Sequence, residues 1–175
     1  MKRVAILCLF LVGCEVEIEQ PVDANPESLA LTHEASQTNW IWISPQEIQQ
    51  LPANGPAYEA VKSWASQAVT TPSLADQDDP DNIRTLAKAF VCIRNGLYCN
   101  EVRTACMAII GTESDSLSRG LSVGRELLAY VVAAQLVGLS ANDDVRFRSW
   151  LAALRTRTLP DGQTLISTHE DRPNN

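Results

Sequence analysis

The last nine residues of the chain, Ser167 to Asn175, combine side chains that can do chemistry. They read Ser-Thr-His-Glu-Asp-Arg-Pro-Asn-Asn and include one of the two histidines, His169. An imidazole, two carboxylates, a guanidinium and two amides can move protons and bind an anionic group. A polar arm that leaves a helical scaffold is a common place for a site, and it is also what a solvated chain end looks like. Composition alone favours the solvated arm and leaves both interpretations open.

Three cysteines beyond the N-terminal region form the pattern C-x6-C-x6-C: Cys92, Cys99 and Cys106. The pattern lacks the close pairs of a structural zinc site, and no histidine lies nearby, so we expect no metal site and no cofactor. Cys99 and Cys106 are two helical turns apart, about 10 Å by rise, which is too far for a disulfide. Two alternatives remain: small apolar residues in a helical hairpin, or a Cys92–Cys99 disulfide across Gly96, which an oxidising compartment permits.

The first residues have the layout of a secretory signal. Lys2 and Arg3 give a positive start, residues 4–12 form an unbroken apolar run, and small Gly13 precedes Cys14. The run is too short to span a bilayer, which takes roughly 20 residues. The ending Leu-Val-Gly-Cys resembles the bacterial lipobox, which implies that Cys14 carries a lipid and anchors the protein to a membrane. The alternative is an ordinary cleaved signal peptide in which the cysteine has no role.

We therefore expect three parts: a signal peptide over residues 1–13, a tether over residues 14–39 and a helical domain over residues 40–175. Residues 15–39 hold six acidic side chains and no lysine or arginine, which favours a disordered linker. By the sorting that the lipobox resemblance implies, Glu15 favours the outer membrane over the inner one. The expected location is the periplasm, with the chain held by its lipid.

The charge balance excludes general nucleic-acid binding. The formal net charge is −7, and removal of Lys2 and Arg3 with the signal peptide lowers it to −9. Nucleic acids and anionic membranes are bound through Lys and Arg side chains, which are in deficit here. An acidic polysaccharide stays possible as a partner, because a local basic patch can bind it against the net charge.

From Trp40 onward the hydrophobic spacing predicts an all-α fold. Short connections favour antiparallel helix hairpins. The expected starts and ends are a capping box at Ser44–Glu47, a start at Asn54–Gly55–Pro56, a helix from Asp79–Pro80 to Asn95–Gly96, a helix over about 98–110, a helix over about 121–139, and a last helix capped by Ser140 or Asn142.

The fifth predicted helix is apolar nearly all round, which is typical of a helix buried between others. Its longest apolar run, residues 127–137, is too short to span a membrane. After Thr158 the helical pattern stops, and residues 159–162 predict a turn that leads into the polar arm. The expected core stripe of the third helix is Ile83, Leu86, Ala87, Phe90 and Val91.

The terminal motif is similar to a loop of alginate-lyase-type polysaccharide lyases, in which an Asn-Asn pair leads into the active site. Three further segments agree: residues 43–52, which begin Ile-Ser-Pro-Gln-Glu and end Leu-Pro, Asp-Pro-Asp-Asn at 79–82 and Gly-Arg-Glu-Leu at 124–127. The resemblance covers about Trp40 to Asn175. It implies an α/α toroid of antiparallel helix pairs, of which this chain would form an incomplete part, about half.

The family reaction is β-elimination from a uronate-containing glycan such as alginate. It removes a proton beside a carboxylate, so the enzyme must neutralise that carboxylate with donors and supply a base. By motif position Asn175 stands where the donor would be, with Asn174 beside it, and these are the expected catalytic residues. His169 and Arg172 are expected to bind the substrate and shape the cleft.

The family pattern continues beyond this motif through further donors, the base and more helices. We therefore expect the truncated front part of a lyase domain, incomplete as a catalyst by itself. Two other functions stay open. A non-catalytic glycan-binding lipoprotein would keep a groove and lose the base, and a helical scaffold lipoprotein ranks third because the sequence shows no recurring period.

Overall fold

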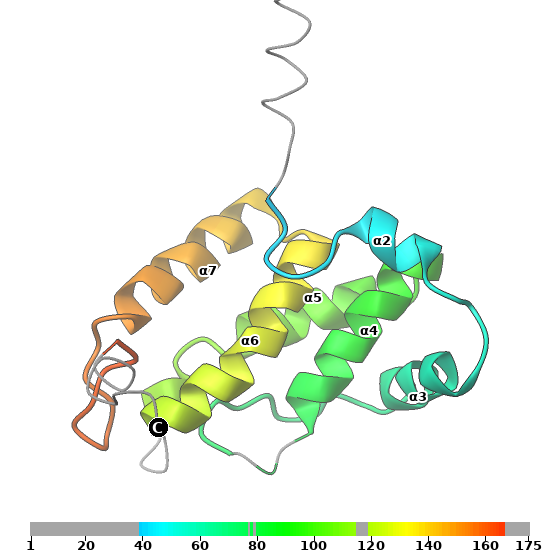
Figure 1. Ribbon diagram of the computed structural model, residues 1–175. Helices are drawn as coiled ribbons and strands as arrows, with labels where there is room; N and C mark the ends of the chain where they lie inside the picture. The colour runs from blue at the N-terminus through cyan, green and yellow to red at the C-terminus, as the bar shows by residue number, and fades with distance from the viewer. Residues whose placement is uncertain (1–38, 77, 79, 115–118, 167–175) are drawn as a thin grey trace, which may run out of the picture. The chain divides into compact units, whose positions relative to one another are not determined.

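The computed structural model describes residues 39–76, 78, 80–114 and 119–166, and those from Trp40 onward belong to one compact unit. Within these ranges the chain is helical and contains no strand, which confirms the expected all-α class. The elements, shown in Figure 1, are α2 (Pro45–Gln50), α3 (Pro56–Ala65), α4 (Asp81–Asn95), α5 (Cys99–Ala108), the 3-10 helix η1 (Thr112–Ser114), α6 (Gly120–Val137) and α7 (Ala141–Leu154).

The predicted helix starts are confirmed where the structure describes them. Ser44 caps α2 with a full capping box: the Glu47 amide donates to Ser44 Oγ over 3.2 Å, and the Ser44 amide donates to Glu47 Oε2 over 2.8 Å. Ser140 caps α7 by accepting from the Asp143 amide over 3.2 Å. Asp79 lies outside the described residues, and Pro80 occupies the N-cap position of α4.

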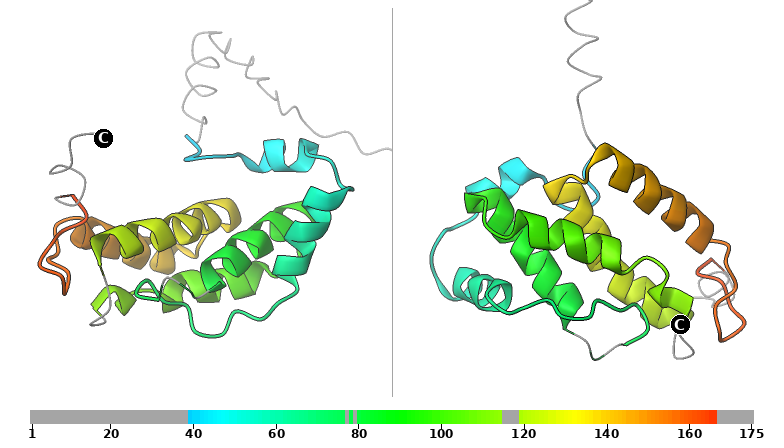
Figure 2. Two further views of the ribbon diagram at one scale, coloured as in Figure 1. Left: turned by 60° about the horizontal axis from the view of Figure 1, so that its bottom comes forward. Right: turned by 180° about the vertical axis from the view of Figure 1, so that it is seen from behind.

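The helices form two layers. α4 and α6 share the most extensive interface, α3 packs on α4, and α5 packs on both α4 and α6. α5 and α7 lie on one side of the α4–α6 pair, and the segment that leads into α2 crosses the other side (Figures 1 and 2). The connections at 96–98 and 138–140 are short, as expected. The connection at 66–80 is longer than expected, and the one at 109–119 contains the 3-10 helix η1.

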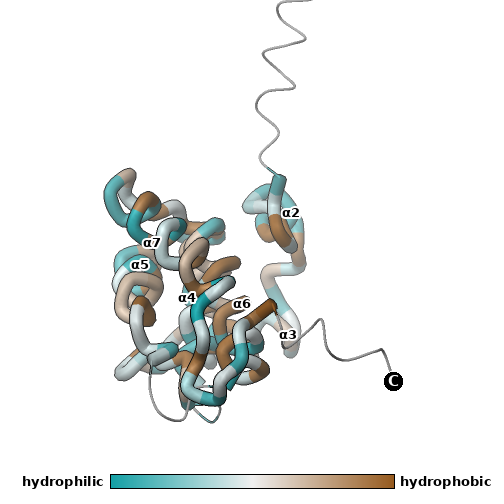
Figure 3. The backbone as a smooth tube through the Cα atoms, turned by 90° about the vertical axis from the view of Figure 1, so that its left-hand side faces the viewer, coloured by the Kyte–Doolittle hydropathy of each residue, from teal (hydrophilic) through white to brown (hydrophobic). Residues whose placement is uncertain are grey.

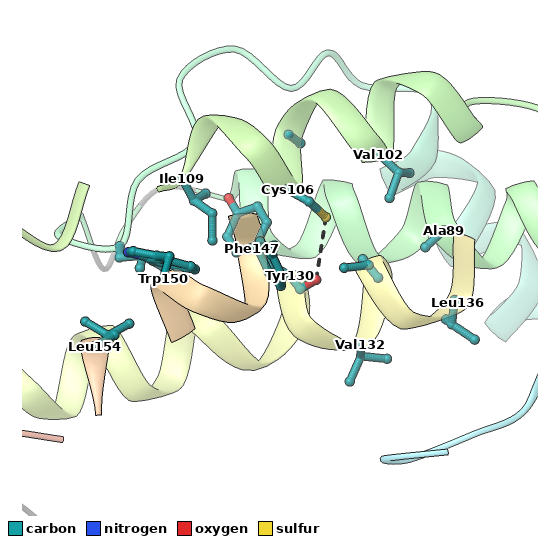
Figure 4. Close-up of a cluster of buried hydrophobic side chains, with 14 of the residues drawn as sticks. Ala89, Val102, Cys106, Ile109, Tyr130, Val132, Leu136, Phe147, Trp150 and Leu154 are labelled. Atoms are coloured by element: carbon teal, nitrogen blue, oxygen red, sulfur yellow. Dashed lines mark hydrogen bonds between the residues drawn. The ribbon is translucent and has the colours of Figure 1, made fainter. Parts of the chain in front are cut away.

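One apolar core joins α4, α5, α6 and α7. Figure 4 shows side chains from α5 and α6 facing one another, with Phe147 and Trp150 of α7 beside them, their ring centroids 5.5 Å apart. Of the core stripe predicted for α4, Ala87 and Val91 are buried, whereas Ile83 is 47% exposed because no described helix covers it. The main members of the core are Ala89, Val102, Ala105, Cys106, Ile109, Val123, Tyr130, Val132, Ala133, Leu136, Phe147, Trp150 and Leu154.

α6 differs from the helix that the sequence predicts. Hydrophobic stretches run along α6 in Figure 3, yet Leu121 is 62% exposed and Leu128 is 58% exposed. The prediction that this helix has no exposed face is therefore wrong, because no described helix covers its side opposite α5. α6 is also the one helix of the described ranges long and apolar enough to cross a membrane, with a mean hydropathy of 1.3 over 18 residues. Because 56% of that window is buried, packing in the core explains its apolar character.

The turn between α4 and α5 is closed by a disulfide between Cys92 and Cys99, with their Cα atoms 5.1 Å apart. Gly96 ends α4 in the left-handed region at φ 76°, as the sequence predicts. Tyr98 also has a positive φ of 66°, which costs a residue with a Cβ of the order of 1–2 kcal/mol. The disulfide joins the residues that flank this turn, and it thereby holds the backbone of the turn in place.

Lys88 is a buried cation that links three helices. It is 2% exposed, and its Nζ donates to the Ala65 carbonyl at the end of α3 over 2.8 Å. The same atom pairs with Glu101 Oε2 of α5 at 2.9 Å and lies 4.1 Å from the Tyr98 ring centroid. From sequence alone a lysine in a helix is expected to face solvent, so the sequence did not predict that Lys88 is buried and links three helices.

We expect removal of the disulfide to lower the stability of the fold. Cys92→Ser with Cys99→Ser should decrease the free energy of unfolding by about 2 kcal/mol, the value for cross-linking a short loop. Urea unfolding with and without a reductant measures it. The reduced wild-type chain should match the double variant, and the reductant should leave the double variant unchanged. A wild-type chain that is insensitive to the reductant would contradict the disulfide.

Lys88→Met should destabilise the protein by about 1–3 kcal/mol, because it leaves the buried Ala65 carbonyl without its donor. Lys62→Met is the matched control, since Lys62 is 47% exposed and pairs with exposed Glu59. That control should change the stability by less than about 1 kcal/mol. Equal effects of the two substitutions in urea unfolding would show that Lys88 has no special role.

Candidate functional site

The residues that the sequence singles out for chemistry lie outside the described ranges. They are the lipidation candidate Cys14, the catalytic candidates Asn174 and Asn175, and the substrate-binding candidates His169 and Arg172. Their predicted roles stay predictions. What the structure describes is the turn that leads towards the arm, and the other three segments of the family resemblance.

The predicted turn at 159–162 is confirmed. The Gly162 amide donates to the Leu159 carbonyl over 2.8 Å, and Gly162 has a φ of 80° that favours glycine. Leu159 is buried, and Asp161 Oδ2 accepts a bond from the Gly120 amide at the start of α6 over 3.1 Å. The turn is therefore fixed to the first residue of α6 at a defined point.

A buried carboxylate fixes the chain just before this turn. Glu113 of η1 is fully buried, and its Oε1 accepts from Trp150 Nε1 over 3.1 Å and from Arg157. Arg157 is 39% exposed and follows the end of α7. This ion pair joins η1 to the residues that lead into the turn, so the chain leaves the helical core in a set direction.

Two of the resemblance segments meet at the start of α4. Glu126 of the 124–127 segment is 2% exposed and accepts a hydrogen bond from Asn82 Nδ2 of the 79–82 segment. Its other oxygen, Oε1, pairs with Arg125 Nε at 2.9 Å. Asn82 and Glu126, which are 44 positions apart in the sequence, thus belong to one polar cluster with Arg125. The buried Glu126 carboxylate orients the Arg125 guanidinium.

An apolar hollow of about 400 Å³ lies beside this cluster, on the face of α4 and α6 that the N-terminal segment crosses. Its volume is within the range typical of small-molecule sites. Two further hollows of about 280 Å³ each continue it: one shares Trp42 and Leu86 with it, and the next shares Val61 and Phe90 with that one. The first hollow is lined by Ile41, Trp42, Leu86, Arg125, Leu128, Ala129 and Val132.

The N-terminal segment that lines the hollow is fixed at both ends. The Ile41 amide donates to Gln135 Oε1 of α6 over 2.9 Å, and the Trp42 and Phe90 ring centroids lie 6.0 Å apart. At the other end, Arg94 Nη1 donates to the carbonyls of Ile48 and Leu51 over 2.8 and 2.9 Å. The hollow is therefore built into the fold.

Asp81, in the 79–82 segment, has a structural role. It is fully buried, and its Oδ2 accepts from the backbone amides of Thr70 and Thr71 over 2.8 Å each. Burial raises the pKa of the carboxyl, but the bonds from Arg84, Thr71 and Thr70 outweigh burial and hold the pKa below its ordinary value of 3.8. Asp81 thereby fixes the long connection between α3 and α4 as a charged carboxylate.

The described residues hold no group of three or more His, Cys, Asp or Glu side chains arranged for a metal ion. Sequence reasoning did not single out Trp42, Asn82, Arg125 or Glu126 as site residues. Asn82, Arg125 and Glu126 had a signal, because each belongs to a segment of the family resemblance. Trp42 had none, since its exposure depends on how the N-terminal segment crosses the helices.

Comparison with known proteins finds no match: no family model, no curated protein and no solved structure matches the chain.

The stability of the fold should fall in acid through Asp81. Because the folded pKa lies below 3.8, the charged carboxylate contributes stability above that pH and loses it as the pH falls through the folded pKa. Asp81→Asn should remove this part of the pH dependence and destabilise the neutral-pH protein by about 1–3 kcal/mol. Unfolding free energies at neutral pH and near pH 3 measure both effects. Asp144→Asn, at a half-exposed ion pair on α7, is the control and should change little.

Proposed function

We propose that the chain is a polysaccharide lyase of the alginate-lyase type, which acts on a uronate-containing glycan by β-elimination. The observation that carries the proposal is the cluster of Asn82, Arg125 and Glu126, because it brings together two segments that resemble the family. The packing of α4 on α6 places these two segments side by side. The cluster also borders an open face with an apolar hollow, which is where a ligand would find room.

The helix arrangement is consistent with the front of an α/α toroid. In the proposed arrangement α4 and α6 are neighbouring inner helices, and α3, α5 and α7 lie outside them. The exposed face of α4 and α6 would then look towards the substrate cleft. The exposure of Leu128 and Ile83 on this face, at 58% and 47%, supports that orientation.

The proposed chemistry rests on the terminal motif. Asn175, with Asn174 beside it, would donate to the substrate carboxylate and stabilise the second negative charge that forms when the neighbouring proton leaves. His169 and Arg172 would bind the glycan next to it. The turn fixed by Asp161 and the Glu113–Arg157 pair would give the motif a constant starting point.

The proposed location is the periplasm, where Cys14 would carry the lipid. The Cys92–Cys99 disulfide supports it, since disulfides persist in oxidising compartments such as the periplasm.

A second candidate is a glycan-binding lipoprotein without catalysis. The composition of the hollows favours it: among the described residues that line them there is no histidine and no carboxylate, so they offer a binding surface and no strong base. Tyr58 lines one of the hollows and is the one lining side chain with a hydroxyl on a ring. In this function the same face would hold the glycan and leave it intact.

Asn175→Ala should strongly lower the rate of elimination. Loss of a donor to the developing charge typically lowers kcat by about 10²–10³-fold. The assay follows the rise in ultraviolet absorbance from unsaturated chain ends when the full-length protein acts on alginate. Asn142→Ala, at an exposed position of α7, is the matched control and should retain the wild-type rate.

The same assay, combined with alginate binding by calorimetry, separates the candidates. Binding with no unsaturated ends would assign the chain to the glycan-binding candidate. Absence of both binding and elimination would exclude both candidates.

A further inference from the structure

α3 is the long helix that the rest of the fold holds least. Of its ten residues only Ala65 is buried, whereas every other described helix of ten or more residues buries at least three. Its extensive interface is with α4 alone among the described helices (Figures 1 and 2), and the chain that leads into it, residues 51–55, is exposed. A segment with few buried contacts opens at a lower free-energy cost than the rest of a protein. α3 is therefore the helix most able to move by itself.

α3 also lines two of the three linked hollows. Tyr58 and Val61 line one hollow of about 280 Å³, and Val61 and Trp64 line the next. α4 contributes Phe90 to both of them. The hollow of about 400 Å³ has no α3 residue among its described lining residues. A movement of α3 away from α4 would therefore widen the first two hollows and leave the third as it is.

A buried cation holds the C-terminal end of α3. Lys88 Nζ of α4 donates to the carbonyl of Ala65, the last residue of α3, over 2.8 Å. A cation at a helix C-terminus also interacts favourably with the helix dipole. Ala65 packs with Ala87 and Val91 in a small apolar cluster separate from the main core. The attachment of α3 thus depends on a small cluster and on one buried amine.

The same amine is tied to the start of α5. Lys88 Nζ lies 2.9 Å from Glu101 Oε2 and 4.1 Å from the Tyr98 ring centroid. Tyr98 is the N-cap of α5, Glu101 lies in its first turn, and Cys99 stands between them. The disulfide joins Cys99 to Cys92, which follows Lys88 by one turn of α4. The disulfide therefore keeps both partners of the amine against it.

Without the disulfide the start of α5 would be free to relax. Tyr98 has a φ of 66°, in a region that is costly for a residue with a Cβ, and it would leave that region. The Glu101 side chain is 55% exposed and would exchange the amine for water. A buried ammonium with fewer partners is unfavourable, so Lys88 would turn to solvent and release the Ala65 carbonyl.

We propose that the Cys92–Cys99 disulfide is a redox lock on α3: the oxidised form holds the helix through Lys88, and reduction by a dithiol releases the helix and widens the two hollows that it lines. A thiolate of the reductant attacks one sulfur and expels the other cysteine as a thiolate, and the second thiol of the reductant then displaces the first cysteine. The chain gains two electrons and two protons, and the reductant becomes a disulfide.

The lock is accessible to such a reductant, because Cys92 and Cys99 are both partly exposed. The inference goes beyond the proposed function, since it concerns the walls of the hollows and applies to any ligand that they hold. Its test therefore needs no glycan.

The test follows backbone hydrogen exchange of the full-length protein by mass spectrometry, oxidised and after treatment with dithiothreitol. The α3 amides should exchange about tenfold faster in the reduced protein, the effect on a local opening of losing one charged hydrogen bond. Labelling times are kept short enough that the α6 amides in the main core stay protected in both forms, so that a general loss of stability is not read as movement of α3. Reoxidation should restore the slow exchange.

A double-mutant cycle tests whether the lock acts through Lys88. Lys88→Met should speed the exchange of α3 about tenfold in the oxidised protein, and reduction of this variant should then add less than about threefold. Glu101→Gln removes the charge of a half-exposed partner and leaves the buried amine in place. It should speed the exchange of α3 by about threefold.

Two controls accompany these variants. Arg148→Met also removes a paired cation, 75% exposed on α7, and should leave the exchange of α3 unchanged in both redox states. Cys92→Ser with Cys99→Ser should exchange its α3 amides as fast as the reduced wild type does, and dithiothreitol should not alter it.

Equal exchange of α3 in the oxidised and reduced wild type would overturn the lock. So would equal acceleration of α3 and α6, which is a general loss of stability. An effect of reduction as large in Lys88→Met as in the wild type would show that the disulfide acts by another route. If Lys88→Met does not fold, Glu101→Gln takes its place in the cycle, and an undiminished effect of reduction in that variant overturns the lock in the same way.

Discussion

α4 and α6 meet along the largest helix interface, and that interface contains a carboxylate that neither helix could bury alone. Glu126 of α6 accepts a hydrogen bond from Asn82 of α4, so a slip of one helix past the other would remove the donor that this buried carboxylate receives from α4. The apolar side chains of a core tolerate such a slip better than a hydrogen bond does. This hydrogen bond therefore helps to fix the register of α4 against α6, and α3 and α5 pack on this pair.

The same pattern recurs at the other buried charges, each of which joins parts of the chain that are distant in sequence. Asp81 fixes the long connection that precedes α4, and Lys88 joins the end of α3 to α5. Glu113 joins η1 to the residues after α7. In a domain of short helices with an open face, these bonds determine which helix ends meet, while the apolar core supplies most of the stability.

Much of the local structure could be predicted from the sequence, because helix ends have local causes. The Ser44 capping box, the Gly96 end of α4 and the Ser140 cap depend on residues within one turn, and each is where the sequence predicts it. The buried Lys88 and Glu113 could not be predicted, since a charged residue is buried only when a distant partner arrives. The exposure of Ile83 and Leu128 was missed for the converse reason: an apolar stripe predicts burial without saying whether a neighbour covers it.

The candidate site was also predictable only in part. The resemblance pointed to the segments 79–82 and 124–127, and the structure brings Asn82 and Glu126 of these segments together. Nothing in the sequence pairs Trp42 with Phe90, or sets Trp42 beside Arg125, because those neighbours depend on the path of the N-terminal segment over the folded helices.

The burial of Cys106 has a consequence for how the chain matures. Burial raises the pKa of its thiol to about 12, and its Sγ donates to the Tyr130 carbonyl over 3.5 Å. Disulfide exchange requires a thiolate, so Cys106 does not take part in exchange once the core has formed. Cys92–Cys99 and Cys99–Cys106 would close loops of equal length, because both pairs are seven residues apart. Formation of α5 decides between them, since it places Cys99 and Cys106 two helical turns apart, about 10 Å by rise and too far for a disulfide. Folding thus protects the Cys92–Cys99 disulfide from exchange with Cys106.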